Sequence, residues 1–194
     1  MSELEVATGT PGWAGAVTAL VPGQGRARVV AVEGRSGAGK STVAAHLAEV
    51  LRSRGEAVHV LTMEDLYAGW EGLAEGAELL RGRVLEPLAR GEAPVWHRWD
   101  WEHGTFSTAP SSLPSEVARD GVLIVEGTGS GVRPGPVDLL VWVHAPDTVR
   151  ARRLDRREDA HLYSPFRAAW AEQEARHLAL HRPEEHARVR VDNG

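Results

Sequence analysis

Apolar residues along this chain recur with two different periods, which predict alternating strands and helices. Short runs rich in valine, leucine and isoleucine predict buried strands. These runs are residues 28–33, 57–62, 122–125, 139–143 and 187–191. Elsewhere, apolar residues recur every three or four positions, the spacing of an amphipathic helix. The predicted helices are residues 41–54, 71–90, 147–158 and 164–181, with a short leading helix over residues 12–20.

Strands that alternate with helices indicate right-handed β-α-β units, in which helices cover both faces of a parallel sheet. We therefore predict an α/β fold with a five-stranded parallel sheet flanked by helices. One domain is expected over residues 1–194, with an N-terminal extension over residues 1–27. Ligands of such sheets bind at the carboxyl ends of the strands. Residues that directly follow a strand are therefore the first candidates for a functional site.

The segment after the first predicted strand, GRSGAGKS, matches the nucleotide-binding pattern G-x-x-x-x-G-K-[ST]. Its glycines let backbone N–H groups turn toward phosphate oxygens, and the following helix directs its positive end at the same anion. We predict that Lys40 reaches the β- and γ-phosphates of ATP and that Ser41 holds Mg²⁺. The nucleotide-binding residues predicted in this segment are Gly34, Ser36, Gly37, Ala38, Gly39, Lys40, Ser41 and Thr42.

The composition adds weight to this lysine. The chain has 22 basic residues, of which Lys40 is the only lysine. A compact ammonium fits between phosphates where the wide, planar guanidinium of arginine does not. The net charge of −5 argues against broad binding to nucleic acid or to membrane surfaces. The absence of cysteine, of a signal peptide and of an apolar run long enough to cross a bilayer leads us to expect a cytoplasmic protein.

Two acidic residues follow other predicted strands and belong to the same edge of the sheet. Glu126 ends the run VLIVE and suits a contact to Mg²⁺ or to water beside the phosphates. Asp65 follows the second strand, where a carboxylate could accept the proton of a substrate hydroxyl. The alternatives are solvation of the strand end for Glu126 and a turn-forming role for Asp65. The neighbouring Glu64 is a competing carboxylate.

With GRSGAGKS, Asp65-Leu66-Tyr67 and VEG in this order, the chain resembles uridine kinases and their phosphoribulokinase and pantothenate kinase relatives. The similarity is closer to actinobacterial uridine kinase-like proteins, and it includes EDLYAGWEGL, RWDW and WAEQEARH within residues 28–192. The resemblance implies the P-loop fold of nucleoside and nucleotide kinases, with ATP and Mg²⁺, and it implies that Asp65 is the catalytic general base. Tyr67 matches the aromatic residue that ends the D-x-[FY]-Y motif of this family and is expected to bind substrate.

The segment VWHRWDW is expected to contact the acceptor. Trp99 and Trp101 lie two positions apart, so on an extended segment they share a face and could clamp a planar base. Uridine kinases use an aromatic-Asp-aromatic segment at a similar place, which implies substrate contacts for Arg98, Trp99, Asp100 and Trp101. The alternative is a tryptophan-rich core hairpin. Trp stands where that family has Tyr and Phe, and the downstream His-Ser-Arg cue is missing, so the segment does not indicate uridine itself.

Arg150, Arg153 and Arg157 are spaced i, i+3, i+7 and share one face of a predicted helix. The resemblance implies a short lid, about residues 150–163, that brings these arginines to the phosphates of ATP, with Arg153 taking part in catalysis. The alternative is a solvated basic face. His177 and His181 have a spacing that zinc can use, but no third ligand lies at a suitable spacing, so a solvated helix face is expected there.

These features predict a kinase that transfers the γ-phosphoryl of ATP to a hydroxyl of a small molecule, most of all a nucleoside. The alternatives are a kinase of another metabolite and a nucleotide-binding regulatory protein with little turnover. The expected partners are ATP and the small-molecule acceptor, without nucleic acid and without a membrane.

Overall fold

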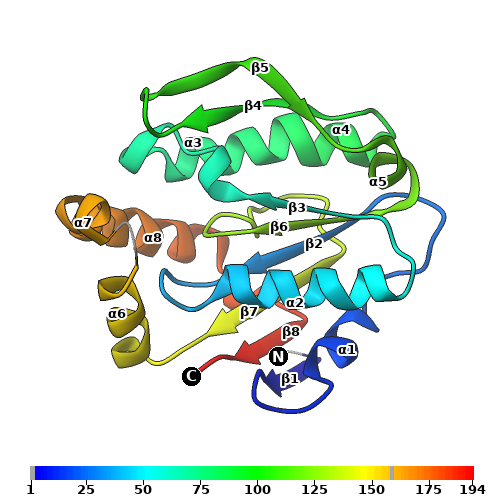
Figure 1. Ribbon diagram of the computed structural model, residues 1–194, viewed down its shortest axis with the longest axis horizontal. Helices are drawn as coiled ribbons and strands as arrows, with labels where there is room; N and C mark the ends of the chain where they lie inside the picture. The colour runs from blue at the N-terminus through cyan, green and yellow to red at the C-terminus, as the bar shows by residue number, and fades with distance from the viewer. Residues whose placement is uncertain (1–2, 158–159) are drawn as a thin grey trace.

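A parallel sheet forms the centre of the protein, seen in a computed structural model that describes residues 3–157 and 160–194 (Figure 1). Its six strands lie in the order β1-β8-β7-β2-β6-β3. They are β1 (Leu4–Ala7), β2 (Arg28–Glu33), β3 (Val58–Thr62), β6 (Val122–Glu126), β7 (Leu139–His144) and β8 (Val189–Asp192). Every neighbouring pair in this sheet is parallel. The predicted α/β class is therefore confirmed.

The prediction of five strands is wrong by one. The sixth strand, β1, belongs to the predicted N-terminal extension and pairs with β8 at the other end of the chain, Leu4 opposite Val189 and Val6 opposite Val191. It has only four residues, LEVA, and a single polar residue interrupts the three apolar ones. So short a run carries no clear period of its own, because its pairing depends on a partner far away in the sequence.

Helices cover both faces of the sheet because alternate strand residues point to opposite sides. Val30 and Val32 of β2 face α1 (Trp13–Thr18) and α2 (Lys40–Ser53) in one core cluster. Val29 belongs to the cluster on the other face. The helices of that second face are α3 (Leu73–Leu79), α4 (Glu86–Ala89), α5 (Ser115–Asp120) and α8 (Arg167–His181).

Two predicted helices are interrupted in the structure. The helix expected over residues 71–90 consists of α3, a π-helical segment over Leu80–Leu85, and α4. The one expected over residues 164–181 begins as a 3-10 turn over Ser164–Phe166 and continues as α8. A short helix, α9 (Pro183–His186), leads into β8.

The segment VWHRWDW forms a hairpin outside the main sheet. Its strand β4 (Val95–Asp100) pairs antiparallel with β5 (Thr105–Ser112), at the top of Figure 1 above α3 and α4. Trp96 is buried in the core beneath it. The segment therefore forms a hairpin, but of its tryptophans only Trp96 is buried in the core, whereas Trp99 is half-buried and Trp101 is 40% exposed.

Helices α6 (Asp147–Asp155), α7 (Ala160–Tyr163) and α8 gather at the edge of the sheet toward which β2 and β7 point, on the left in Figure 1. The predicted lid over residues 150–163 falls on α6 and α7, and its residues 158 and 159 lie outside the described residues. Within the described part of the chain, no helix combines the length and the apolar character needed to cross a membrane.

Candidate active site

The loop between β2 and α2 requires glycine for its shape. Gly34, Gly37 and Gly39 all have positive φ, at 154°, 78° and 93°. A Cβ atom at Gly34 would lie 2.4 Å from the carbonyl oxygen of Val143, and one at Gly37 would lie 2.6 Å from that of Arg150. Conformation and space therefore both exclude a side chain at these positions. The loop leads directly into α2, whose first residue is Lys40.

Lys40 lies across its own loop. Its Nζ donates hydrogen bonds to the carbonyl oxygens of Gly34, at 2.8 Å, and Arg35, at 3.2 Å, and to Thr128 Oγ1 at 3.4 Å. These partners are neutral oxygens, and a charged phosphate oxygen is a stronger partner for an ammonium. The lysine is thus placed beside the cavity with partners that an anion can replace.

A cavity of about 510 Å³ opens beside this loop and has two chemically different ends. The polar end is lined by the loop and by Glu126. Its loop residues are Ser36, Gly37, Gly39, Lys40 and Ser41. The other end is aromatic, and its rings belong to Tyr67, Trp70, Trp101, Tyr163 and Trp170. One continuous space therefore joins a phosphate-binding loop to a wall that suits a flat or apolar group.

Glu126 ends β6 at the polar end of the cavity and is 7% exposed. Burial raises the pKa of its carboxyl above the usual value of a glutamate, while the charge of Lys40 and hydrogen bonds from Thr62 and Ser41 act in the opposite direction. The Ser41 hydroxyl and the Glu126 carboxylate are therefore neighbours. Oxygen donors of this kind are the protein ligands that Mg²⁺ prefers, with phosphate oxygens and water completing its shell, so these residues fit the magnesium ion that P-loop folds bind.

The two acidic residues after β3 have different surroundings. They lie in a 3-10 turn over Met63–Asp65, in which successive side chains point about 120° apart. Glu64 lines the cavity, and its carboxylate lies 3.5 Å from the guanidinium of Arg157. Asp65 is half-buried and forms a 3.0 Å ion pair with Arg98. Of these two described residues, only Glu64 reaches the cavity, so the structure does not bring Asp65 or Arg98 to the place that the sequence predicted for them.

Trp70 is the centre of the aromatic end. Its ring stacks on Phe166 at 5.2 Å between centroids and with 10° between planes. The rings of Trp101, Tyr163 and Trp170 surround it at 4.9, 5.7 and 6.4 Å. No site role was predicted from the sequence for Trp70, Tyr163 or Trp170. The only signal was the density of aromatic residues in EDLYAGWEGL and around α8, because the contacts join segments almost a hundred residues apart.

The tryptophan clamp predicted for Trp99 and Trp101 does not form. Strand β4 ends at Asp100, so the two residues do not continue one extended face. Trp99 packs edge-on against Phe106 across the hairpin, with 5.0 Å between centroids. Trp101 lies in the turn, contacts Trp70, and donates from Nε1 to the carbonyl oxygen of Glu64 at 3.0 Å. Only Trp101 of the pair lines the cavity.

Asp100 supports the hairpin turn instead of facing the cavity. Its carboxylate accepts hydrogen bonds from the backbone N–H groups of Glu102 and His103, both at 3.0 Å, and contacts His103 Nδ1 at 2.8 Å. The backbone and side chain of His103 lower the pKa of Asp100. A substrate contact for Asp100 thus has no support in its geometry.

Two of the three predicted lid arginines, Arg150 and Arg153, donate to the phosphate loop, whereas Arg157 lies beside Glu64 and Tyr163. Arg150 donates to the Ser36 carbonyl oxygen at 2.9 Å and pairs with Asp147. Arg153 donates to the carbonyl oxygens of Ala38 and Asn193, at 3.2 and 2.8 Å. Arg157 lies over the ring of Tyr163, with 5.9 Å between the guanidinium carbon and the ring centroid. Of these arginines, Arg153 and Arg157 line the cavity.

The remaining predicted residues have mixed placements. Tyr67 lines the cavity but is almost fully buried, and its hydroxyl donates to the Thr128 carbonyl oxygen at 2.5 Å. Burial raises its pKa well above the usual range of tyrosine. Thr42 is exposed in the first turn of α2. The expected solvated face for His177 is wrong, because this ring is 5% exposed and lies 3.6 Å from buried Glu33.

Comparison with solved structures supports a kinase-like fold. A "possible uridine kinase" from Bacillus stearothermophilus superposes with a TM-score of 0.63 at 21% identity, covering 90% of this chain and 94% of that one. A "putative fructose transport system kinase" from a Silicibacter species gives a TM-score of 0.55 at 21% identity, covering 93% and 97%. The chain therefore shares the α/β fold of these two proteins and carries, after β2, a loop that matches the nucleotide-binding pattern.

The sequence match to a protein family covers a smaller part of the chain than the structural matches do. The family model of the methylmalonyl Co-A mutase-associated GTPase MeaB matches residues 14–70, which contain the phosphate loop with its flanking strand and helix. No curated protein matches the sequence. The matched stretch contains the loop that P-loop proteins with ATP and with GTP have in common, so this match does not separate ATP from GTP as the nucleotide.

Proposed function

We propose that this protein is a small-molecule kinase that transfers the γ-phosphoryl group of ATP to a hydroxyl group. One observation carries the proposal, namely the single cavity that joins the GRSGAGKS loop to an aromatic compartment. The aromatic residues line the same cavity as the phosphate loop, so an acceptor bound against them would lie beside the phosphates. The kinase-like architecture of the neighbouring structures agrees with this proposal but does not name an acceptor.

The polar end supplies the charge stabilisation that phosphoryl transfer requires. Lys40, Arg153 and Arg157 are the cations at the cavity, and each would stabilise phosphate oxygens as negative charge shifts between them. Ser41 and Glu126 would hold Mg²⁺, which when bound neutralises charge on the phosphates. Arg150 holds the loop through the Ser36 carbonyl oxygen, so its proposed part is to shape the site.

The proton of the acceptor hydroxyl needs a carboxylate that reaches the cavity. Glu64 lines the cavity and Asp65 does not, so we assign Glu64 the role of general base and treat Asp65 as the alternative that the sequence favoured. In this step the hydroxyl oxygen bonds to the γ-phosphorus, its proton passes to the Glu64 carboxylate, and the bond to the β-phosphate oxygen breaks. ADP and the phosphorylated acceptor leave.

The pair Glu64→Gln and Asp65→Asn tests this assignment. We expect Glu64→Gln to lower the rate of transfer by roughly 10²–10⁴-fold with little change in nucleotide affinity, as for a lost general base. Asp65→Asn breaks the pair with Arg98. It should lower the melting temperature and leave the rate of transfer nearly unchanged. The opposite pattern would return the role to Asp65.

The aromatic end favours an acceptor with a flat body, and a nucleoside is the leading class. Stacking a base on an aromatic side chain contributes about 1–3 kcal/mol, and Trp70 and Trp101 line the cavity together. The test is ADP release from Mg·ATP across a panel of nucleosides, sugars, vitamin precursors and antibiotics. Transfer to a non-planar metabolite alone would support the metabolite kinase instead.

A nucleotide hydrolase or regulator that uses GTP is the second candidate, because the MeaB model matches the phosphate-loop region. The two candidates differ in what stimulates turnover. A kinase shows product formation that depends on the acceptor and prefers ATP, whereas the second candidate shows GTP hydrolysis that no member of the panel accelerates. Parallel assays with both nucleotides therefore separate them.

A further inference from the structure

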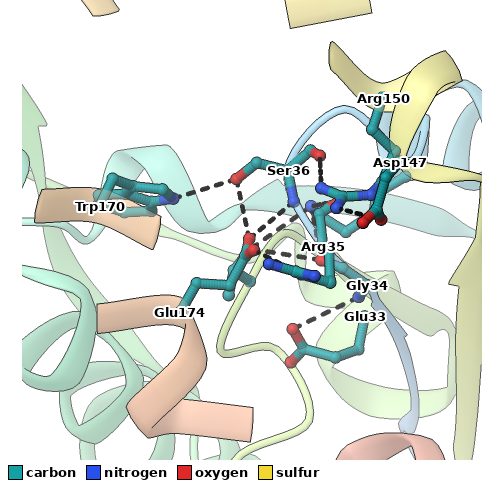
Figure 2. Close-up of polar contacts among 10 residues, drawn as sticks. Glu33, Gly34, Arg35, Ser36, Asp147, Arg150, Trp170 and Glu174 are labelled. Carbon is teal, nitrogen blue, oxygen red and sulfur yellow. Dashed lines mark hydrogen bonds and ion pairs between the residues drawn. The ribbon is translucent and has the colours of Figure 1, made fainter. Parts of the chain in front are cut away.

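A buried carboxylate from α8 holds the front half of the phosphate loop. Glu174 is 2% exposed, and its oxygens accept three hydrogen bonds from the loop (Figure 2). The donors are the Ser36 backbone N–H at 2.7 Å, the Ser36 hydroxyl at 2.9 Å and Arg35 Nε at 3.0 Å. Glu174 itself does not line the cavity, whereas Ser36 does. The carboxylate thus acts on the loop and not on a bound ligand.

Ser36 is fixed on every polar atom. Besides the two contacts with Glu174, its hydroxyl oxygen accepts from Trp170 Nε1 at 3.1 Å, and its carbonyl oxygen accepts from Arg150 at 2.9 Å (Figure 2). Its N–H is directed at the carboxylate of α8. The front of the loop is therefore set by α8 and α6, while the phosphate cradle is left to the N–H groups that follow, from Gly37 onward.

Only a carboxylate satisfies this set of contacts. Both oxygens of a carboxylate accept hydrogen bonds, and neither carries a proton to donate. The amide of glutamine would instead present an N–H group to one of the three donors. A buried ion pair is weak evidence for stability, because removing a charge from water is costly. The charge at residue 174 therefore indicates a demand for loop geometry, not for stability alone.

The same helix face joins the loop to the aromatic end of the cavity. Trp170 lies one turn before Glu174, donates to Ser36, and packs edge-on against Tyr67 with 4.9 Å between centroids. It also contacts Trp70. Ser36 is thus the junction between the phosphate end and the wall where an acceptor would lie, and a shift of this residue would change the distance between the two reacting groups.

We propose that Glu174 is a positioning residue for phosphoryl transfer. It fixes the front of the phosphate loop against α8, and so sets the distance between the transferred phosphoryl group and the acceptor hydroxyl. This rests on the proposed kinase function. Nucleotide affinity should depend mainly on the rear of the loop and on Lys40, whereas the rate of transfer should depend on the position of Ser36. Small misplacements of reacting groups cost up to roughly 100-fold in rate.

The variant Glu174→Ala tests the proposal, because it removes both oxygens that hold Ser36 and Arg35. Turnover of Mg·ATP, to the acceptor found in the panel or to water, should fall by roughly 10- to 100-fold, while the Kd of Mg·ADP measured by calorimetry should stay within about threefold of wild type. Glu174→Asp should recover part of the rate because it restores the charge. The matched control is Glu172→Ala on the same helix, where an exposed carboxylate pairs only with Arg176 at 3.5 Å, and it should leave both quantities unchanged.

Backbone hydrogen exchange gives a readout that is independent of turnover. The Ser36 amide should be protected in wild type without nucleotide and should exchange at least tenfold faster in Glu174→Ala, which removes both acceptor oxygens. In Glu174→Gln the remaining oxygen can still accept from Ser36, so exchange should be slower there than in Glu174→Ala. Wild-type turnover in Glu174→Ala would overturn the positioning role. The positioning role would also be overturned if turnover fell only to the extent that the variant is unfolded at the assay temperature, as its melting curve shows. Absence of any turnover in the wild type would overturn the kinase function as well, and so is distinguishable from failure of this proposal alone.

Discussion

Replacing Glu33 by alanine should both destabilise the fold and loosen the site. This residue ends β2, is fully buried, and carries the loop that follows β6. Its carboxylate accepts from the backbone N–H of Gly129 at 2.9 Å and from that of Gly131 at 2.7 Å. The same loop presents Thr128 to the ammonium of Lys40. The substitution removes the acceptor and leaves two buried N–H groups without it.

The magnitude follows from those two groups. A buried donor that loses its partner costs about 1–3 kcal/mol, so the free energy of unfolding should fall by about 2–6 kcal/mol. For a chain of this length each kcal/mol lowers Tm by about 2–4 °C. We therefore expect Tm to fall by on the order of 10 °C.

Calorimetric or fluorescence melting checks the value. Glu33→Gln keeps one acceptor oxygen, so its Tm should fall by less than half as much as that of Glu33→Ala. Glu92→Gln removes a carboxylate whose ion pair with Arg90 is exposed on both sides, and it should change stability by less than about 0.5 kcal/mol. Equal melting of Glu33→Ala and wild type would refute the idea that the carboxylate holds the loop.

Three further predictions concern the cavity. Lys40→Arg keeps the charge but should lose most phosphoryl transfer, because the guanidinium cannot occupy the space of an ammonium; near-native turnover would contradict it. Trp101→Ala should raise the acceptor KM with little effect on the KM of ATP, whereas Trp99→Ala, in the hairpin, should act mainly on Tm, and equal effects on acceptor KM would contradict the division. Because burial raises the pKa of Glu126, its carboxyl takes up a proton at a higher pH than an ordinary glutamate. The Mg²⁺-dependent part of nucleotide affinity should therefore be present at neutral pH, fall as the pH drops through that raised value, and lose this pH dependence in Glu126→Gln, as titration calorimetry at several pH values can measure.

The β2-loop-α2 unit could be predicted from sequence because its determinants are local. The buried run over residues 28–33, the glycines at fixed offsets and the apolar face of α2 all act within about 25 residues, and the structure places each where the pattern indicated. The strand β1 could not be predicted in the same way. Its four residues become a strand only by pairing with β8, at the opposite end of the chain.

The aromatic end of the cavity shows the same limit. A pair of tryptophans two positions apart was the visible signal, and an extended segment would have placed them on one face. The strand ends at Asp100, so Trp101 turns away and meets Trp70 instead. The residue at which a strand ends depends on the turn that Asp100 caps and on the packing of the hairpin. The alternation of residues along an extended segment predicts neither.

The choice between adjacent acidic residues is a sharper case, because both candidates occupy the predicted edge of the sheet. Position at the strand end does not separate Glu64 from Asp65, and the family resemblance favoured Asp65. In the structure the 3-10 turn directs Glu64 to the cavity and Asp65 to Arg98. Glu174 is the reverse case, since it lies in WAEQEARH, a segment that contributes to the resemblance but for which the sequence predicted no site residue, yet it reaches Ser36 across 138 positions. Motifs thus mark the groups that touch phosphate, whereas the groups that orient those motifs are chosen by packing, and a variant series aimed only at GRSGAGKS would leave the second set untested.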